Sequence, residues 1–151
     1  MSEDSVTTGT IEDLFKAIKS SNSDSVRSII SSNKDLTKEK LRDATAKFDV
    51  DVEIDAYKFL GAYIGSCTPL QMALLKGHDS IAKDIIDVSS KEDLDVSFGG
   101  GNTALHLATL LGAKEIVKLL LERGANRQAR NTKGFAPVDV LDDSEMRKLF
   151  Q

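Results

Sequence analysis

Apolar residues recur along the chain at helical spacing, in pairs of short segments that are separated by a glycine. The clearest pair lies between residues 103 and 124. The Thr103 hydroxyl can cap the first segment, and Gly124 can end the second in a left-handed conformation. Gly112 permits a tight turn between the two. The buried stripe of the second segment consists of Ile116, Val117, Leu120 and Leu121. The pattern predicts two antiparallel helices joined by a short turn.

The same pattern occurs on both sides of this pair, at intervals of about 33 to 35 residues. Thr68 and Gly77 correspond to its cap and its turn. Pro69 and Pro137, the two prolines of the chain, take the first helical position, where a missing N–H is harmless. A degenerate copy precedes them at about 10–35. These intervals predict a stack of helical pairs that bury their apolar faces against one another.

The Thr-Pro-Leu start at Thr68 and the Thr-Ala-Leu-His start at Thr103 resemble the ankyrin repeat. The resemblance implies an all-α solenoid of paired antiparallel helices with hairpin loops, irregular at both ends, in one domain over 1–151. The expected units are repeat 1 at about 10–35, an insertion at about 36–63, repeat 2 at about 64–98, repeat 3 at about 99–131 and repeat 4 at about 132–151. Repeat 4 has room for a second helix of about two turns. Either the stack ends in a short cap or the chain is part of a longer protein.

The insertion has two patterns of its own. Leu41, Ala44 and Phe48 share one helical face. That spacing predicts a helix over 38–48. Residues 49–55 alternate acidic and apolar side chains, which predicts a half-buried strand. We expect the insertion to fold against the stack, either as a connector that covers the first two repeats or as an additional binding element.

Composition narrows the class of protein. With 151 residues, of which 40% are hydrophobic, the chain can build a continuous core. A net charge of −4 gives no general reason to bind nucleic acid or an acidic membrane. The single cysteine, Cys67, excludes a disulfide framework. The polar residues 1–9 lack a signal-peptide pattern, and no apolar run approaches ~18 residues. We therefore expect a protein of the cytoplasm or the nucleus, with no membrane partner.

The residues that carry chemistry in other proteins have structural roles in this pattern. The resemblance implies that His106 ties neighbouring repeats together through backbone hydrogen bonds, although Gln71 and Asp139 take its place elsewhere. It also implies a structural role for His78 in a turn between helices. The glycines of 99–101 are not followed by the Gly-Lys-Ser/Thr ending of a phosphate-binding loop, so we expect a flexible hairpin tip.

Cys67 precedes a predicted helix start, which favours a slightly lowered thiol pKa, but it has no basic neighbour in sequence. We interpret it as a small packing residue. No catalytic motif is present, and no metal-ligand spacing occurs around either histidine. We expect no enzyme, no cofactor and no metal.

Ankyrin proteins usually contact partners through their hairpin tips and inner helices, so the resemblance points to the same surface here. The matching positions are Cys67, Leu75, Lys76, Asn102, Leu110, Leu111, Thr132, Lys133 and Phe135. The leucines and Phe135 are apolar where polar residues would serve the fold equally well. We predict that they form an exposed patch for a partner protein. The alternative is that the insertion or a neighbouring segment covers them.

Charge is uneven along the hairpins. The segment 123–133 carries four cations and no acid, and the segment 87–95 carries four acids and Lys91. A groove flanked by opposite charges would orient a partner, unless these are ordinary solvated side chains. Arg127 and Arg130 join the predicted contacts because they could also hold a phosphate. The hairpin lacks base-stacking aromatic residues, so nucleic acid is not an expected partner.

The sequence thus predicts a monomeric, non-catalytic protein-interaction module, acting as an adaptor, an inhibitor or an assembly chaperone. A rigid concave face would lose little entropy on docking. The alternatives are a docking or regulatory domain of a larger enzyme or transporter and, less favoured, a nucleic-acid-associated regulator. Replacing Leu110 and Leu111 by serine is predicted to abolish partner capture with little change in melting temperature.

Overall fold

The structure is a computed structural model that describes residues 10–61, 63–140 and 143–151. The predictions for residues 1–9 lie outside the described part. The helices and strands are α2 (Ile11–Lys19), α3 (Ser23–Ser32), η1 (Lys34–Lys38), β1 (Leu41–Arg42), α4 (Glu53–Phe59), β2 (Ser66–Cys67), α5 (Pro69–Leu75), α6 (Asp79–Val88), α7 (Lys91–Leu94), α8 (Ala104–Leu110), α9 (Lys114–Glu122), η2 (Pro137–Asp139) and α10 (Ser144–Leu149).

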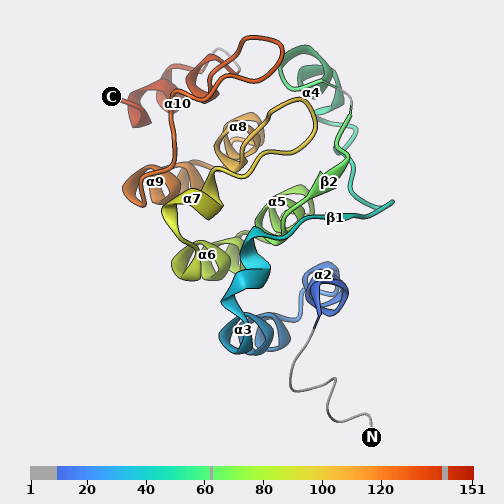
Figure 1. Ribbon diagram of the computed structural model, residues 1–151. Helices are drawn as coiled ribbons and strands as arrows, with labels where there is room; N and C mark the ends of the chain where they lie inside the picture. The colour runs from blue at the N-terminus through green and yellow to red at the C-terminus, as the bar shows by residue number, and fades with distance from the viewer. Residues whose placement is uncertain (1–9, 62, 141–142) are drawn as a thin grey trace, which may run out of the picture.

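Helical pairs form the stack (Figure 1). α2 packs on α3, α5 on α6, and α8 on α9. An inner row runs through α2, α5, α8 and η2, and an outer row runs through α3, α6, α9 and α10. Each pair therefore buries its apolar surface against the next pair, as in a solenoid. The all-α solenoid predicted from the sequence is confirmed.

Threonine caps set the start of the inner helices. The hydroxyl of Thr68 accepts a hydrogen bond from the Gln71 amide at 3.2 Å, and the Gln71 side chain accepts one from the Thr68 amide at 2.8 Å. The same reciprocal capping box joins Thr103 to His106 at the start of α8. It satisfies amides that a helix leaves unpaired in its first turn, so each repeat begins at a defined residue.

The inner helices α5 and α8 are buried on all sides, whereas the outer helices are amphipathic. Every residue of α5 and of α8 is buried. α6 buries one face, which consists of Ile81, Ala82, Ile85 and Ile86. A helix that is surrounded by protein tolerates apolar residues around its whole circumference. The inner helices thus present no free apolar face to a partner.

The insertion differs from its prediction in both halves. No helix forms over 38–48, because Leu41 pairs with Cys67 in the short antiparallel β1–β2 ladder. The predicted strand over 49–55 is also wrong, since α4 begins at Glu53. Val52 and Ala56 are four residues apart and turn toward the core, which anchors α4 at helical spacing. The alternation of acidic and apolar residues in the sequence hides this four-residue helical spacing.

The insertion contacts the last two repeats as well as the first two. η1 contacts α5, α6 and α7, and in Figure 1 α4 lies beside the loops of the last two repeats. There the ring of Phe59 meets the ring of Phe135 edge-on, with centroids 5.2 Å apart and an interplanar angle of 67°. One segment therefore touches every part of the stack from repeat 1 to repeat 4.

The three glycines at 99–101 are packed between neighbouring loops, so the prediction of a flexible tip is wrong. The Gly99 amide donates to the carbonyl of Ile64 at 2.9 Å. The Gly100 carbonyl accepts from the Thr132 amide at 2.8 Å. Gly99 has a φ of +53°, and a Cβ there would collide with the backbone carbonyl of Tyr63. Glycine is needed here for close approach of two backbones.

The fourth unit is shorter than the others. Its first helix is reduced to the 3₁₀ turn η2, and its second helix is α10. Within the described residues, none of the helices has both the length and the apolar character needed to span a membrane.

Candidate functional site

His106 makes two backbone hydrogen bonds, one within repeat 3 and one that joins repeat 3 to repeat 4. Its Nδ1 accepts from the Thr103 amide at 3.0 Å, and its Nε2 lies 2.8 Å from the carbonyl oxygen of Phe135. These partners fit the neutral tautomer that carries its proton on Nε2. The side chain is fully buried, and this burial lowers the pKa of the imidazole. The structural role predicted for His106 is confirmed.

Gln71 makes a similar pair of backbone bonds within repeat 2. Its Oε1 accepts from the Thr68 amide, and its Nε2 donates to the carbonyl of Val96 at 2.6 Å. A glutamine can accept and donate at once, as a neutral histidine does. In the last unit Asp139 accepts from the Ala136 amide at 3.0 Å. The positions without histidine therefore keep the capping bond, and Gln71 also binds a second backbone group, the carbonyl of Val96 in the loop that ends repeat 2.

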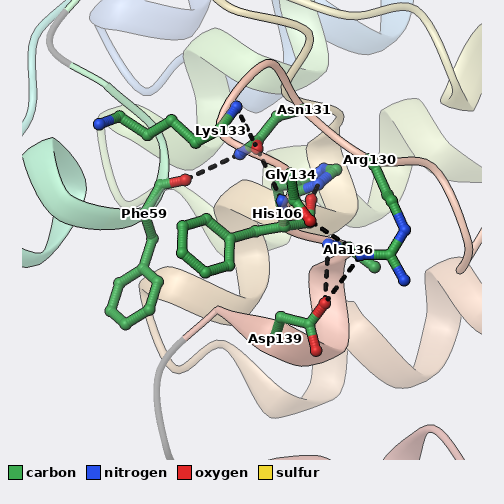
Figure 2. Close-up of polar contacts among 9 residues, drawn as sticks. Phe59, His106, Arg130, Asn131, Lys133, Gly134, Ala136 and Asp139 are labelled. Carbon is green, nitrogen blue, oxygen red and sulfur yellow. Dashed lines mark hydrogen bonds and ion pairs between the residues drawn. The ribbon is translucent and has the colours of Figure 1, made fainter.

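Two buried asparagines of repeat 3, Asn102 and Asn131, hold the insertion against the stack, and Figure 2 shows the bond from Asn131 to Phe59. Asn131 Nδ2 donates to the Phe59 carbonyl, and Asn102 Nδ2 donates to the Leu60 carbonyl, both at 2.8 Å. Asn131 also donates to Asn102 Oδ1 at 2.8 Å. Both side chains are buried, so the bonds are costly to break. The amides satisfy the C-terminal carbonyls of α4 and fix its position.

Asn102 is therefore not the partner contact that the sequence predicted. Its side chain is 0% exposed and is fully engaged within the chain. Cys67 is 0% exposed as well, and burial raises the pKa of its thiol to about 12, with a further contribution from Asp43. The predicted lowering of this pKa is wrong. Its position in β2 removes the thiol from water and from any partner.

The predicted patch of exposed leucines does not form. Leu75 is 7% exposed and Leu110 is 3% exposed, since both belong to inner helices that are buried all round. Leu111 and Phe135 are partly buried and pack against the core. Phe59 of the insertion covers Phe135, so the alternative named for this patch, cover by the insertion, is the correct one there.

Three further predicted contacts keep at least part of their surface exposed. Lys76 is partly buried, and its ammonium group donates to the Thr45 carbonyl of the insertion at 2.8 Å. Thr132 and Lys133 are exposed. Whether these positions contact a partner stays a prediction.

The charged hairpins contact each other instead of flanking an open groove. Arg123 pairs with Asp87 at 2.9 Å across neighbouring repeats. The carboxylate of Asp95 accepts from the amide of Asn126 at 2.8 Å. Oppositely charged side chains at these two hairpins thus stabilise the stack at its edge. Exposed pairs of this kind contribute little each, about 0–1 kcal/mol.

Arg127 and Arg130 lie at the C-terminal edge. Arg127 donates to the Phe150 carbonyl at 2.5 Å, and Arg130 donates to the Gly134 carbonyl at 2.8 Å. They line an open pocket of about 580 Å³, together with Gln128, Ala136, Val138, Asp139, Arg147, Phe150 and Gln151. One function of both arginines is therefore to brace the last unit.

Sequence reasoning missed the apolar surface that the structure does expose. Val50 is 82% exposed and Ile54 is 83% exposed, and Tyr57 and Tyr63 are 50% and 61% exposed. Among the described residues, these four are the large hydrophobic side chains that lie open to solvent, and all belong to the insertion. The sequence carries a signal for this surface in the acid–apolar alternation over 49–55, which predicts a strand with one buried face.

A pocket adjoins this surface. It has a volume of about 590 Å³ and is lined by Arg42, Asp43, Ala44, Ala46, Lys47, Phe48, Glu53, Tyr57, Tyr63, Ile64 and Gly65. Asp43 at its edge pairs with Lys19 at 2.6 Å. Burial raises the pKa of Asp43, but hydrogen bonds from Lys19 and Thr45 outweigh burial and bring it to about 2. The insertion is thereby tied to the first repeat at this end.

A search of the described residues 10–61, 63–140 and 143–151 for three or more histidine, cysteine or acidic side chains that could hold a metal ion finds no such group. The arrangement offers hydrogen bonds for the fold and surface for contact.

Comparison with known proteins identifies the family. A model of ankyrin repeats (3 copies) matches residues 14–131. The chain belongs to the ankyrin-repeat family, whose fold is in general a non-catalytic interaction module. In structure it is similar to the ankyrin repeat domain of Bcl-3, with a TM-score of 0.68 and 16% identity over 91% of this chain and 50% of that one.

The curated relatives match only part of the chain. Zebrafish ankyrin repeat and SOCS box protein 11 is 41% identical over 58 residues, which is 38% of this chain and 20% of that protein. Human palmitoyltransferase ZDHHC17 is 51% identical over 39 residues, which is 26% of this chain and 6% of that enzyme. The chain thus spans a small share of the length of these relatives.

Proposed function

We propose that this chain is a non-catalytic protein-recognition module and that its partner contacts the outer side of the insertion. The observation that carries the proposal is the exposure of Val50 and Ile54, at 82% and 83%. Neighbouring exposed apolar side chains on a protein surface mark a contact with another molecule. Tyr57 and Tyr63 extend this surface toward the pocket, and tyrosine is frequent in interfaces.

The insertion replaces part of the surface that ankyrin stacks usually offer. Phe59 covers Phe135, and Asn131 holds the carbonyl of Phe59, so this stretch of the hairpin face is occupied within the chain. The leucines of the inner helices are buried. A partner that approaches from this side meets α4 first.

α4 is also held in place before any partner arrives. Asn102 and Asn131 donate hydrogen bonds to the carbonyls at its C-terminal end, and the side chain of Ala56, on the inner face of α4, is fully buried. A contact surface that is ordered in the free protein loses less conformational entropy on binding. The exposed hairpin residues Thr132 and Lys133 would form part of a polar rim around it.

The test is affinity capture from the native cell type with three full-length baits. The bait with Val50→Ser and Ile54→Ser is expected to keep its melting temperature and to lose a partner that the unmodified chain retains. A bait with Lys114→Ser and Glu122→Ser, two exposed positions on α9, is the matched control and is expected to retain it. Equal capture by both variants would overturn the proposed contact surface.

The double change of Leu110 and Leu111 to serine has a new expected outcome. Because Leu110 is 3% exposed, we now expect partial or complete unfolding in place of a clean loss of binding. Loss of capture by that variant therefore says nothing about a contact.

A second candidate is a docking or regulatory domain within a larger protein. It is supported by the 51% identity to a segment that makes up 6% of human palmitoyltransferase ZDHHC17. Ankyrin sequence continuing past Gln151 in the gene would favour it. We also propose a monomer in the cytoplasm or nucleus, in line with an unpaired cysteine thiol. Imaging of a fluorescent fusion and sedimentation analysis test these two points.

A further inference from the structure

We propose that the outer side of the insertion binds a basic protein segment that carries both Lys or Arg side chains and apolar anchors. This inference rests on the proposed function and adds the chemistry of the partner. It follows from the charges that surround Val50 and Ile54, from the exposure of the apolar side chains, and from the pocket beside them.

The exposed apolar side chains lie in α4 and in the turn that precedes it. Ile54 and Tyr57 are three residues apart in α4, Val50 lies in the turn before Glu53, and all three are exposed. Val52 and Ala56, between them, turn toward the core. An apolar stripe of this spacing is the usual form in which a helix offers anchors to a partner. The fold itself does not need these side chains on that side.

Carboxylates surround the stripe. Asp49, Asp51, Glu53 and Asp55 alternate with the apolar residues, and all four are exposed. In α4, successive residues project about 100° apart, so Glu53 and Asp55 flank Ile54 on opposite sides. The result is an apolar stripe with acidic borders, which no neutral or acidic partner would complement well.

These acids are not neutralised within the described part of the chain. Asp49, Asp51 and Asp55 form no side-chain hydrogen bond or ion pair there. Glu53 accepts a 3.5 Å hydrogen bond from the Tyr57 hydroxyl, which leaves its charge in place. Lys58 is the one cation on α4, and its ammonium group lies over the Phe59 ring at 5.0 Å. The carboxylates therefore keep a net negative field over the stripe.

Some acids elsewhere in the stack form ion pairs between neighbouring units. Asp84 pairs with Arg27, and Asp87 pairs with Arg123, each across neighbouring units. Those carboxylates serve the fold, whereas Asp49, Asp51 and Asp55 of the insertion form no contact within the described part of the chain. A positive partner would gain attraction here without competing with an internal bond, and the field would speed its encounter.

The adjoining pocket offers a place for one anchor side chain. Phe48, Tyr57 and Tyr63 supply aromatic walls. Charged residues of both signs line it as well, namely Asp43, Glu53, Arg42 and Lys47, and Arg42 donates to the Tyr63 hydroxyl at 2.8 Å. The charges that line the pocket are thus mixed, so the pocket fits an apolar anchor and the acidic border of the stripe fits the cations.

The first experiment selects ligands from a phage-displayed library of random peptides. The immobilised target is the full chain, and phage that also bind the variant Val50→Ser with Ile54→Ser are removed. We expect the enriched peptides to contain an excess of Lys and Arg together with apolar residues. Enrichment of neutral or acidic peptides, or no enrichment beyond that on the variant, would overturn the inference.

The second experiment isolates charge from shape. The affinity of an enriched peptide is measured by fluorescence anisotropy for the full chain and for Asp51→Asn with Asp55→Asn. We expect binding to weaken roughly 2- to 10-fold, as for the loss of two exposed charge pairs. Glu92→Gln with Glu122→Gln removes two exposed acids outside the insertion and is the matched control, with no expected change. Affinity should also fall between ionic strengths of about 0.01 M and about 0.1 M.

Other occupants of this surface give different outcomes. Concentration-dependent self-association in sedimentation that disappears in Val50→Ser with Ile54→Ser would assign the surface to a second copy and overturn the inference. Binding to phosphatidylcholine vesicles that the same variant loses would assign it to lipid. Capture of the native partner that depends on Val50 and Ile54 but not on Asp51 and Asp55 would sustain the proposed function and reject a basic partner.

Discussion

The imidazole of His106 and the carbonyl of Phe135 are joined by a 2.8 Å hydrogen bond between repeats 3 and 4. We predict that His106→Ala destabilises the fold, because it leaves that carbonyl and the Thr103 amide unpaired, at about 1–3 kcal/mol for each buried group. His106→Gln should recover most of the loss, since Gln71 makes the equivalent bonds one repeat earlier. Chemical denaturation measures both, and equal losses in the two variants would contradict this account.

The same residue predicts a dependence of stability on pH. Burial lowers the pKa of His106 from its ordinary value of 6.5 in the folded protein. As the pH drops below 6.5, the unfolded chain binds more protons at this site than the folded chain does. The stability that His106 contributes is therefore fully present above pH 6.5 and is lost as the pH falls through the lowered pKa of the folded protein. Between about pH 8 and about pH 5, the unfolding midpoint should therefore fall more in the unmodified protein than in His106→Gln. Parallel pH profiles would show that His106 does not titrate as the structure implies.

Cys67 should be unreactive while the protein is folded. Its thiol is 0% exposed, and burial raises its pKa to about 12. At mildly alkaline pH a thiol reagent should label it only as the β1–β2 region opens, and denaturant should accelerate the labelling. Complete labelling of the native protein within the mixing time would mean that the ladder between Leu41 and Cys67 is not formed.

Leucine positions on the inner helices should respond to mutation as core positions. Leu110→Ala is expected to reduce the free energy of unfolding by about 2–5 kcal/mol, the cost of a cavity in a packed core. Ile54→Ala, which removes a side chain that is 83% exposed, should change it by less than about 0.5 kcal/mol. Thermal or chemical unfolding measures the contrast, and a neutral Leu110→Ala would restore the exposed-patch interpretation.

The regular part of this fold could be predicted from the sequence because its signals are local. Threonine caps, glycine turns and apolar stripes lie within one repeat, as at Thr103 and Gly112. The burial of Leu75 and Leu110 was also visible in principle, because α5 and α8 are apolar around nearly their whole circumference. The resemblance to the family predicts these leucines at the surface, whereas the apolar pattern of the helices predicts that they are buried, as the structure shows.

The insertion could not be predicted because its structure depends on distant partners. Leu41 pairs with Cys67 in a β-ladder although its spacing in the sequence predicts a helix. Phe59 is positioned by Phe135 and Asn131. Strand pairs and ring contacts of this sequence separation leave no local signal. The alternation over 49–55 fits a strand until Val52 and Ala56 are seen to pack inward together. The site was missed for the same reason.

Deuterium exchange of the full chain, with and without its captured partner, tests the central claim most directly. We predict slower exchange over 49–60 in the complex, with α5 and α8 unchanged, because the partner lies on α4 and the inner helices are already buried. Slower exchange at the hairpin residues 130–134, with no change over 49–60, would contradict the claim.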